Sequence, residues 1–168
     1  MKKSTLINTT LLFILFAFTA TAAQAQIVSY AAKFVCGKND ALVSAGQYFT
    51  LINVHNASPF KKVQYIKRFA IALPDEKPGR ISEFFGGTLA PEEAMSIDCG
   101  NIYQHTGIGA GNFVDGFVII YALGELDVVS VYTAGHTPVE TLHTERVPVR
   151  RVVVPRTHAI AERLRKQE

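Results

Sequence analysis

Cysteine is scarce in this sequence, and several motifs that carry chemistry are missing. The chain of 168 residues has two cysteines, so it contains no C-x-x-C motif and a redox-active pair is not indicated. Its five histidines lie in different segments, and no two of them have the H-x-x-x-H spacing of zinc ligands. The G-x-S-x-G signature of many serine hydrolases is also absent. Motifs therefore predict no catalytic residue, no metal site and no cofactor.

The glycine-bearing segment 107–111 (GIGAG) superficially resembles a loop that holds phosphate groups. Such loops follow a strand and open a helix, whose N-terminus binds the anion. Here the glycines precede a strand-like segment, and no Lys-Ser or Lys-Thr follows them. The segment is therefore predicted to be a flexible loop.

Long apolar runs are rare, and the uninterrupted run at residues 11–18 (LLFILFAF) is too short to cross a bilayer, which takes roughly 20 residues. Lys2 and Lys3 precede it, and the small-x-small pattern Ala23-Gln24-Ala25 follows it. This order is typical of a secretory signal, with an uncleaved anchor as the alternative. The sequence thus predicts a signal peptide over residues 1–25 and a periplasmic or extracellular protein without a transmembrane segment after cleavage.

Charge is low once the predicted signal is removed. The signal contains two of the 17 Lys and Arg residues and none of the 14 acidic residues, which leaves a net charge of +1. The remaining chain of about 140 residues is long enough for one domain with a real core. A nearly neutral domain gives no general electrostatic reason to expect nucleic acid as a partner.

The positive residues that remain gather toward the end of the chain, at Arg146, Arg150, Arg151, Arg156, Arg163, Arg165 and Lys166. They could bind an acidic partner or a lipid head group. The alternative is a solvated strand edge whose charges prevent aggregation. The expected organisation is a β-sandwich domain over residues 26–155 and a basic C-terminal tail over residues 156–168.

Cys36 and Cys99 each end an apolar run and are each followed by glycine. In an oxidising compartment such a pair forms a disulfide when the fold holds the two residues close together. A Cys36–Cys99 bond would reduce the entropy of the unfolded chain and thereby stabilise the folded state by roughly 4 kcal/mol. Two buried free thiols, or a bond between two chains, are the alternatives.

The remaining sequence is rich in β-prone segments and nearly devoid of helical periodicity. Strands are predicted at 30–36, 46–56, 62–73, 94–99, 113–122 and 126–133, with a short strand or turn at 81–85. The stretch 139–154 is broken by Pro148, which favours an edge strand or two short strands. The link 123–125 predicts a hairpin between its neighbouring strands.

Two short helices are also considered, one around 101–105 and one at 157–166, the second marginal unless it docks. No βαβ unit, repeat or low-complexity tract is present. The pattern predicts an all-β protein, an antiparallel Ig-like β-sandwich of about seven or eight strands with a short C-terminal helix or tail. A closed barrel is the alternative.

Four polar residues are candidates for binding. Asn53 and His55 alternate with Leu51 on one face of the predicted strand 46–56, so His55 either completes the rim of a core face or contacts a ligand. Asp115 and Asp127 fall on the two strands of the predicted hairpin. Two carboxylates at suitable separation can catalyse glycoside hydrolysis, although such residues more often mark a solvated face.

The segments YAAKFVCG, GQYFTLINVHN, GRISEFFGGTLAPEEAMSIDCGNI and FVDGFVIIYALGELDVVSVYTAG occur in that order. Together they resemble a family of small secreted prokaryotic proteins of unknown function, over residues 30–151. The resemblance implies a recurring extracytoplasmic β-sandwich module and no particular activity. The order of strands is also distantly similar to the β-sandwich of the sensory rhodopsin transducer family, a likeness of pattern that transfers no residue and no function.

These observations favour an exported, non-enzymatic binding or structural module for a protein or surface ligand that the sequence does not name. A secreted carboxylate-dependent hydrolase or carbohydrate-active protein, using residues such as Asp115 and Asp127, is the alternative. An enzyme would place two or more titratable groups in one concave pocket, which a binding module does not require. The sequence sets no oligomeric state.

The exported protein is expected to begin at Gln26, because Ala23-Gln24-Ala25 is the small-x-small site that directly follows the apolar run. N-terminal sequencing or the intact mass of the exported protein measures this. Recovery of a form that still carries Met1 would contradict the prediction.

Overall fold

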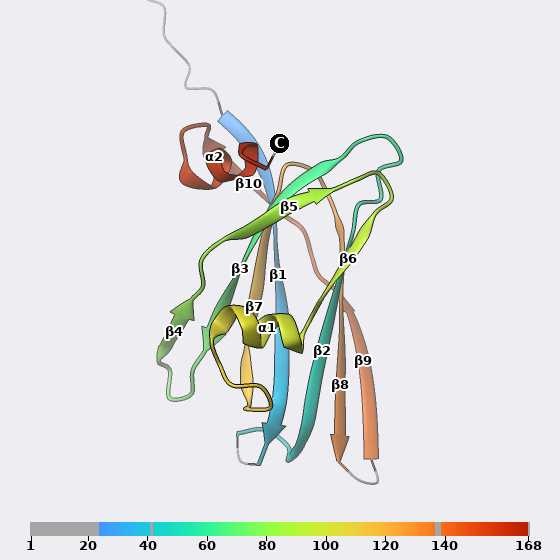
Figure 1. Ribbon diagram of the computed structural model, residues 1–168, viewed down its shortest axis with the longest axis vertical. Coiled ribbons are helices and arrows are strands. Elements are labelled where there is room, and N and C mark those ends of the chain that lie inside the picture. The colour runs from blue at the N-terminus through green and yellow to red at the C-terminus, as the bar shows by residue number, and fades with distance from the viewer. Residues whose placement is uncertain (1–23, 41, 137–138, 168) are drawn as a thin grey trace, which may run out of the picture.

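The computed structural model describes residues 24–40, 42–136 and 139–167, and the first 23 residues of the predicted signal lie outside them (Figure 1). These residues form ten strands and two short helices. The elements are β1 (Gln24–Asn39), β2 (Gly46–His55), β3 (Val63–Ala72), β4 (Pro78–Ile81), β5 (Phe85–Leu89), β6 (Ala94–Asp98), α1 (Cys99–Thr106), β7 (Val114–Ala122), β8 (Asp127–His136), β9 (Val139–Arg146), β10 (Arg150–Pro155) and α2 (Ala159–Arg165). In the described part of the chain, neither helix is long and apolar enough to cross a membrane.

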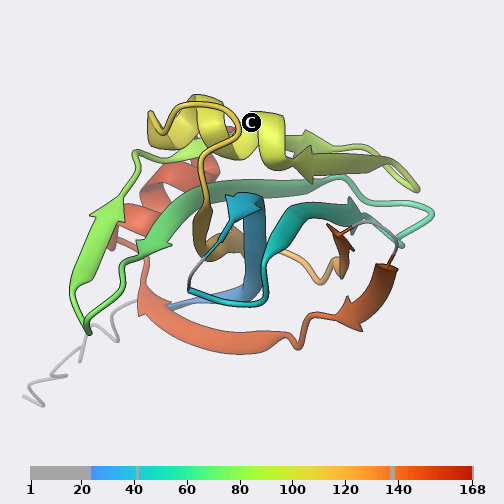
Figure 2. The ribbon, with the colours of Figure 1, turned by 90° about the horizontal axis from the view of Figure 1, so that it is seen from below.

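The ten strands form one continuous antiparallel sheet in which β1 is shared by two halves. Its main path runs β4-β3-β7-β1-β2-β8-β9, while β10 pairs with β1, β5 with β3, and β6 with β2. One half, named the β3–β7 half, contains β3, β4, β5, β7 and β10 with most of β1. The other, the β2–β8 half, contains β2, β6, β8 and β9 with the end of β1. Seen from below, β1 and β3 lie between α1 on one side and β10 on the other (Figure 2).

The core lies between these two halves, because each strand alternates buried and exposed residues. Phe34 of β1 and Val118 of β7 are fully buried from one half, and Ile52 of β2 and Val128 of β8 are buried from the other. All of them belong to the same apolar cluster. The all-β, antiparallel fold with a short C-terminal helix is thereby confirmed.

The predicted hairpin between the strands at 113–122 and 126–133 is wrong. β7 pairs with β1 and β3, whereas β8 pairs with β2 and β9. The link between them crosses from one half to the other, and Leu126 at its end is buried. The Tyr30 hydroxyl accepts a hydrogen bond from the Leu126 amide at 2.7 Å and donates one to the Leu126 carbonyl at 2.9 Å. This contact with β1 holds the link as an arch between the halves.

The first strand also differs, since β1 begins at Gln24 where residue 30 is expected, because residues 24–29 pair with β10. Further differences fall where proline and glycine weaken the strand pattern. β4 begins at Pro78, outside the predicted strands, and β5 contains Gly86 and Gly87. The stretch 139–154 divides around Pro148 into β9 and β10, which is one of the two expected outcomes. The described residues therefore contain ten strands where about seven or eight are expected.

Helix α1 is stabilised at both ends by local hydrogen bonds. The Asp98 carboxylate accepts a hydrogen bond from the Asn101 amide at 2.8 Å, and the Asn101 side chain accepts one from the Asp98 amide at 3.1 Å. Gly107 ends the helix with φ of 68°, in the left-handed region that favours glycine. The short helix considered around residues 101–105 is confirmed and begins slightly earlier.

A disulfide joins Cys36 in β1 to Cys99, the first residue of α1, with Cα atoms 5.7 Å apart. Both cysteines are buried. The bond connects β1 to the segment that directly follows β6, and β6 pairs with β2. The predicted pairing is confirmed, together with its role as a link between the first strand and the strand after Pro91.

Reduction of the Cys36–Cys99 bond is expected to lower the free energy of unfolding by about 2–4 kcal/mol without changing the fold, because the core contains apolar side chains from both halves. Urea unfolding with and without dithiothreitol measures this difference. A Cys36→Ser/Cys99→Ser double variant is the control, and its midpoint should not respond to the reductant. Equal midpoints for oxidised and reduced protein would show that the bond adds no stability.

Candidate functional site

Three of the four polar residues singled out from the sequence lie on the outer face of the β2–β8 half. His55 and Asp127 are register partners on β2 and β8, with His55 Nδ1 3.8 Å from a carboxylate oxygen of Asp127. Arg146 of β9 also forms an ion pair with Asp127. Asn53 is exposed on the same face, opposite Val129. The structure therefore brings His55 and Asp127 together in a solvent-accessible charged cluster.

Asp115 lies elsewhere. It is near the start of β7 and forms an ion pair with Lys33 of β1 at 2.7 Å. Asp127 begins β8, beyond the far end of β7, so strand geometry separates the two carboxylates by a distance on the order of 20 Å. Paired glycosidase carboxylates are roughly 5–10 Å apart. Asp115 and Asp127 are therefore not brought together.

Across residues 24–40, 42–136 and 139–167, no three His, Cys, Asp or Glu side chains gather as metal ligands would. A different cluster of titratable groups lies beneath α1. His105 stacks on Phe69 with ring centroids 5.4 Å apart, and its ring centroid lies 3.9 Å from that of Phe85. Burial, together with the Lys67 ammonium, lowers the pKa of His105. Burial also lowers the pKa of Lys67. Protonation of both bases is therefore less favourable here than in open water.

Helix α2 covers part of the outer face of the β3–β7 half. Ala161 and Leu164 lie three residues apart and therefore on one side of the helix. Both are buried in a cluster with Ile27 of β1 and Ile66 of β3. A helix of this length is marginal alone, and this apolar contact supplies the docking surface that it needs. The basic segment expected as a tail from residue 156 thus packs against the sheet.

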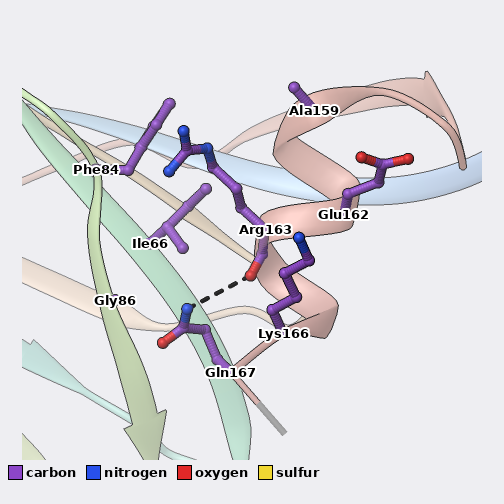
Figure 3. Close-up of a pocket in the computed structure, with 8 residues that line it drawn as sticks. All are labelled: Ile66, Phe84, Gly86, Ala159, Glu162, Arg163, Lys166 and Gln167. Atoms are coloured by element: carbon purple, nitrogen blue, oxygen red, sulfur yellow. Dashed lines mark hydrogen bonds between the residues drawn. The ribbon is translucent and has the colours of Figure 1, made fainter.

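A cavity of about 420 Å³, named the α2 pocket, lies between α2 and the strands β3 and β5 (Figure 3). Its wall on the sheet side is apolar, and its charged side chains come from α2 and the residue that follows it. Cavities of this size accommodate small molecules. The lining residues are Ile66, Phe84, Gly86, Ala159, Glu162, Arg163, Lys166 and Gln167.

Gln167 closes one end of the α2 pocket by a close approach to β5. The Thr88 hydroxyl donates a hydrogen bond to the Gln167 carbonyl at 3.0 Å. A Cβ atom at Gly86 would lie 2.8 Å from Gln167 Cδ and equally close to the Tyr65 carbonyl oxygen. Glycine at position 86 therefore leaves room for the backbone of β3 and for the Gln167 side chain.

Two guanidinium groups approach the ring of Phe84. Arg163 Cζ lies 5.2 Å from the ring centroid, and Arg68 Cζ of β3 lies 4.9 Å from it. Within the described residues, neither these groups nor Lys166 have a carboxylate oxygen within 4.0 Å, and Arg68 Nε is buried without a hydrogen-bond partner. Figure 3 shows Arg163 reaching from α2 across Ile66 toward Phe84. Glu162 is the one carboxylate in the lining, so the α2 pocket has a net positive charge, and its cations form no ion pair with a described carboxylate.

Two other cavities contain charges of both signs. One of about 320 Å³ lies between β1 and the β2–β8 half and includes Lys33 and Glu145. Another of about 390 Å³, near the end of β3 and the start of β7, includes the Lys33–Asp115 pair. The α2 pocket also contains a carboxylate, Glu162, but it has two lining cations, Arg163 and Lys166, so its lining has a net positive charge. This excess makes it the strongest candidate site.

Sequence reasoning identified the basic residues near the end of the chain and missed Arg68 and Phe84. Arg68 occupies a strand face that otherwise carries Gln64, Ile66 and Ala70. An arginine on the strand face that points away from the main core was the sequence signal that could have identified this site. Its proximity to α2 depends on helix docking, which local sequence does not specify.

No protein-family model matches the chain, and no curated protein matches it. Among solved structures, the crystal structure of Thermotoga maritima 1070 is similar at a TM-score of 0.45 and 13% sequence identity. The similarity covers 74% of this chain and 93% of that chain. A likeness of this degree identifies neither a family nor a function.

The lowered pKa of His105 predicts a stability that depends on pH. The unfolded chain binds the His105 proton more tightly than the folded protein, so this contribution is complete above about pH 6.5 and is lost as pH falls from there toward the lowered pKa. Urea unfolding at pH 7.5 and 5.5 should show a smaller loss of stability for His105→Gln than for wild type. An identical loss in both proteins would show that His105 does not contribute.

Proposed function

We propose that this protein is an exported, non-enzymatic binding module whose α2 pocket holds a ligand with an oxyanion, a phosphate or a carboxylate, joined to an apolar body. The proposal rests chiefly on one observation: Arg163 and Lys166 line the α2 pocket beside a single carboxylate, Glu162, and neither they nor Arg68 beside Phe84 form an ion pair with a described carboxylate. The oxyanion would contact the cations, and the apolar body would lie against Phe84 and Ile66.

The chemistry of these residues suits an oxyanion. The planar guanidinium of Arg163 offers parallel N–H donors that match two oxygens of a carboxylate or phosphate. Lys166 adds a second cation on the same wall. Both cations are exposed, so solvent screens their attraction for an anion, and burial of an apolar body against Phe84 and Ile66 would add to the affinity.

Two independent features support export. Residues 1–25 have the pattern of a secretory signal. The Cys36–Cys99 disulfide belongs to the chemistry of oxidising compartments, since cytosolic thiols are usually kept reduced. The α2 pocket would therefore meet its ligand in the periplasm or outside the cell.

A binding role fits the α2 pocket better than catalysis. Of its lining residues, Glu162 is the carboxylate, and none is a serine, cysteine or histidine nucleophile. The carboxylates proposed for a hydrolase, Asp115 and Asp127, lie at distant positions and do not line the α2 pocket. Binding requires a cavity of suitable size and complementary charge, and the α2 pocket has a volume of about 420 Å³ and a net positive lining.

Isothermal titration calorimetry with hexyl phosphate tests the proposal, with hexanol as the uncharged analogue. Hexyl phosphate should bind, and hexanol should not, because the cations are then left without an anion. Inorganic phosphate should bind more weakly than hexyl phosphate, because it lacks the apolar chain. Hexanoate separates a site that accepts any oxyanion from one that prefers phosphate.

Arg163→Met removes the charge and keeps the apolar stem, so it should weaken hexyl phosphate binding about tenfold or more. Arg165→Met is the matched control on the same helix, outside the pocket lining, and should bind as wild type does. Arg163→Lys should retain part of the affinity, and circular dichroism checks that each variant keeps its fold. Binding of hexanol as tight as hexyl phosphate, no binding of hexyl phosphate, or an equal loss in Arg165→Met would each overturn the proposal.

A further inference from the structure

Strand β9 forms an open edge of the sheet. It pairs with β8 along its whole length, and no other strand among the described residues pairs with its second edge. Figure 1 shows it as the outermost strand of the β2–β8 half. Residues 140–146 are exposed on both faces, and Leu142 retains 70% of its accessible surface. An exposed edge strand is a template for pairing with another strand.

The backbone groups that face this open edge can be identified from the register. The Val147 amide donates to the Val128 carbonyl at 2.9 Å, which makes these two residues a hydrogen-bonded pair. Hydrogen-bonded and non-hydrogen-bonded pairs alternate in antiparallel strands. The amide and carbonyl groups of Glu140, Leu142, Thr144 and Arg146 therefore point away from β8, toward the open edge.

From this geometry we propose that β9 pairs antiparallel with β9 of a second copy of this chain, about a two-fold axis at His143. The outward-facing groups of one copy must then meet outward-facing groups of the other, so even-numbered residues pair with even-numbered residues. A two-fold axis at His143 places Glu140 opposite Arg146 of the second copy, and it does so twice. It also places Leu142 opposite Thr144, within diagonal reach of the second Leu142.

The two neighbouring registers form fewer hydrogen bonds or ion pairs between the two copies. An axis at Thr144 would place Pro148, which has no amide hydrogen, opposite Glu140. An axis at Leu142 would place Glu140 opposite Thr144 and leave both Arg146 residues outside residues 140–146 of the other copy. The axis at His143 uses all of residues 140–146 in both copies and forms about eight backbone hydrogen bonds.

The charges along β9 support a second copy as the occupant. Glu140 and Arg146 have opposite signs and lie at equal distances on either side of His143, so the edge is complementary to itself. Arg146 forms an ion pair with Asp127 and is largely exposed, and its guanidinium has further donors for a carboxylate of the second copy. Exposed ion pairs contribute little affinity, so they select the register while the backbone hydrogen bonds hold the strands together.

Sedimentation velocity of the exported protein between about 1 and 100 µM tests the proposal. Wild type should show a concentration-dependent species of twice the chain mass. Glu140→Arg places like charges opposite each other at both ends of the interface and should raise the dissociation constant about tenfold. Glu140→Arg/Arg146→Glu restores opposite signs and should recover the dimer. Monomeric wild type at 100 µM, or a dimer that Glu140→Arg leaves unchanged, would overturn the proposal.

Leu142→Pro supplies a second test that does not depend on charge. The Leu142 amide faces the open edge, so its removal breaks no hydrogen bond to β8 and should leave the monomer folded. The same change removes a donor from the proposed interface and should abolish the dimer. Retention of a wild-type dimer by a folded Leu142→Pro protein would place the interface elsewhere on the molecule.

Discussion

Strand β1 pairs with strands of both halves of the sheet, and the rest of the structure depends on this shared strand. Its first residues pair with β10, its middle with β7 and its last residues with β2. Tyr30 holds the arch that carries the chain into β8, and Cys36 connects β1 to α1. A cut after Ala25 would leave Gln26 opposite Val153, so a mature chain that begins there keeps its pairing with β10.

The α2 pocket depends on this arrangement. Ile27 of β1 and Ile66 of β3 form the apolar surface on which α2 docks. Docking places Arg163 beside Phe84, whose ring already has Arg68 near it. These cations are far apart in the unfolded chain. Folding brings them together at one cavity. Concentrated positive charge beside an apolar wall is the physical basis of the proposed preference for an amphiphilic anion.

The opposite side of the molecule has a different electrostatic character. The outer face of the β2–β8 half and the edge at β9 carry charges of both signs, including the His55–Asp127–Arg146 cluster. Such alternation can keep an edge strand from pairing indiscriminately, while it still permits one register in which opposite charges meet. Anion binding at α2 and self-association at β9 would use separate surfaces, so one molecule could do both.

Local sequence determined the all-β class and the main strands of this protein, because the alternation in segments such as β2 and β7 reports burial directly. It also predicted the disulfide, since the chain has two cysteines and each ends an apolar run, while the fold brings their Cα atoms within 5.7 Å. Only the tertiary structure decided that β7 and β8 belong to different halves, because the contact that separates them involves Tyr30 and Leu126, far apart in the chain. It likewise decided that Asp127 meets His55 rather than Asp115, and that residues from three distant segments form the α2 pocket. Periodicity describes what each strand buries, whereas the choice of neighbours depends on contacts between residues remote in sequence, which no local pattern encodes.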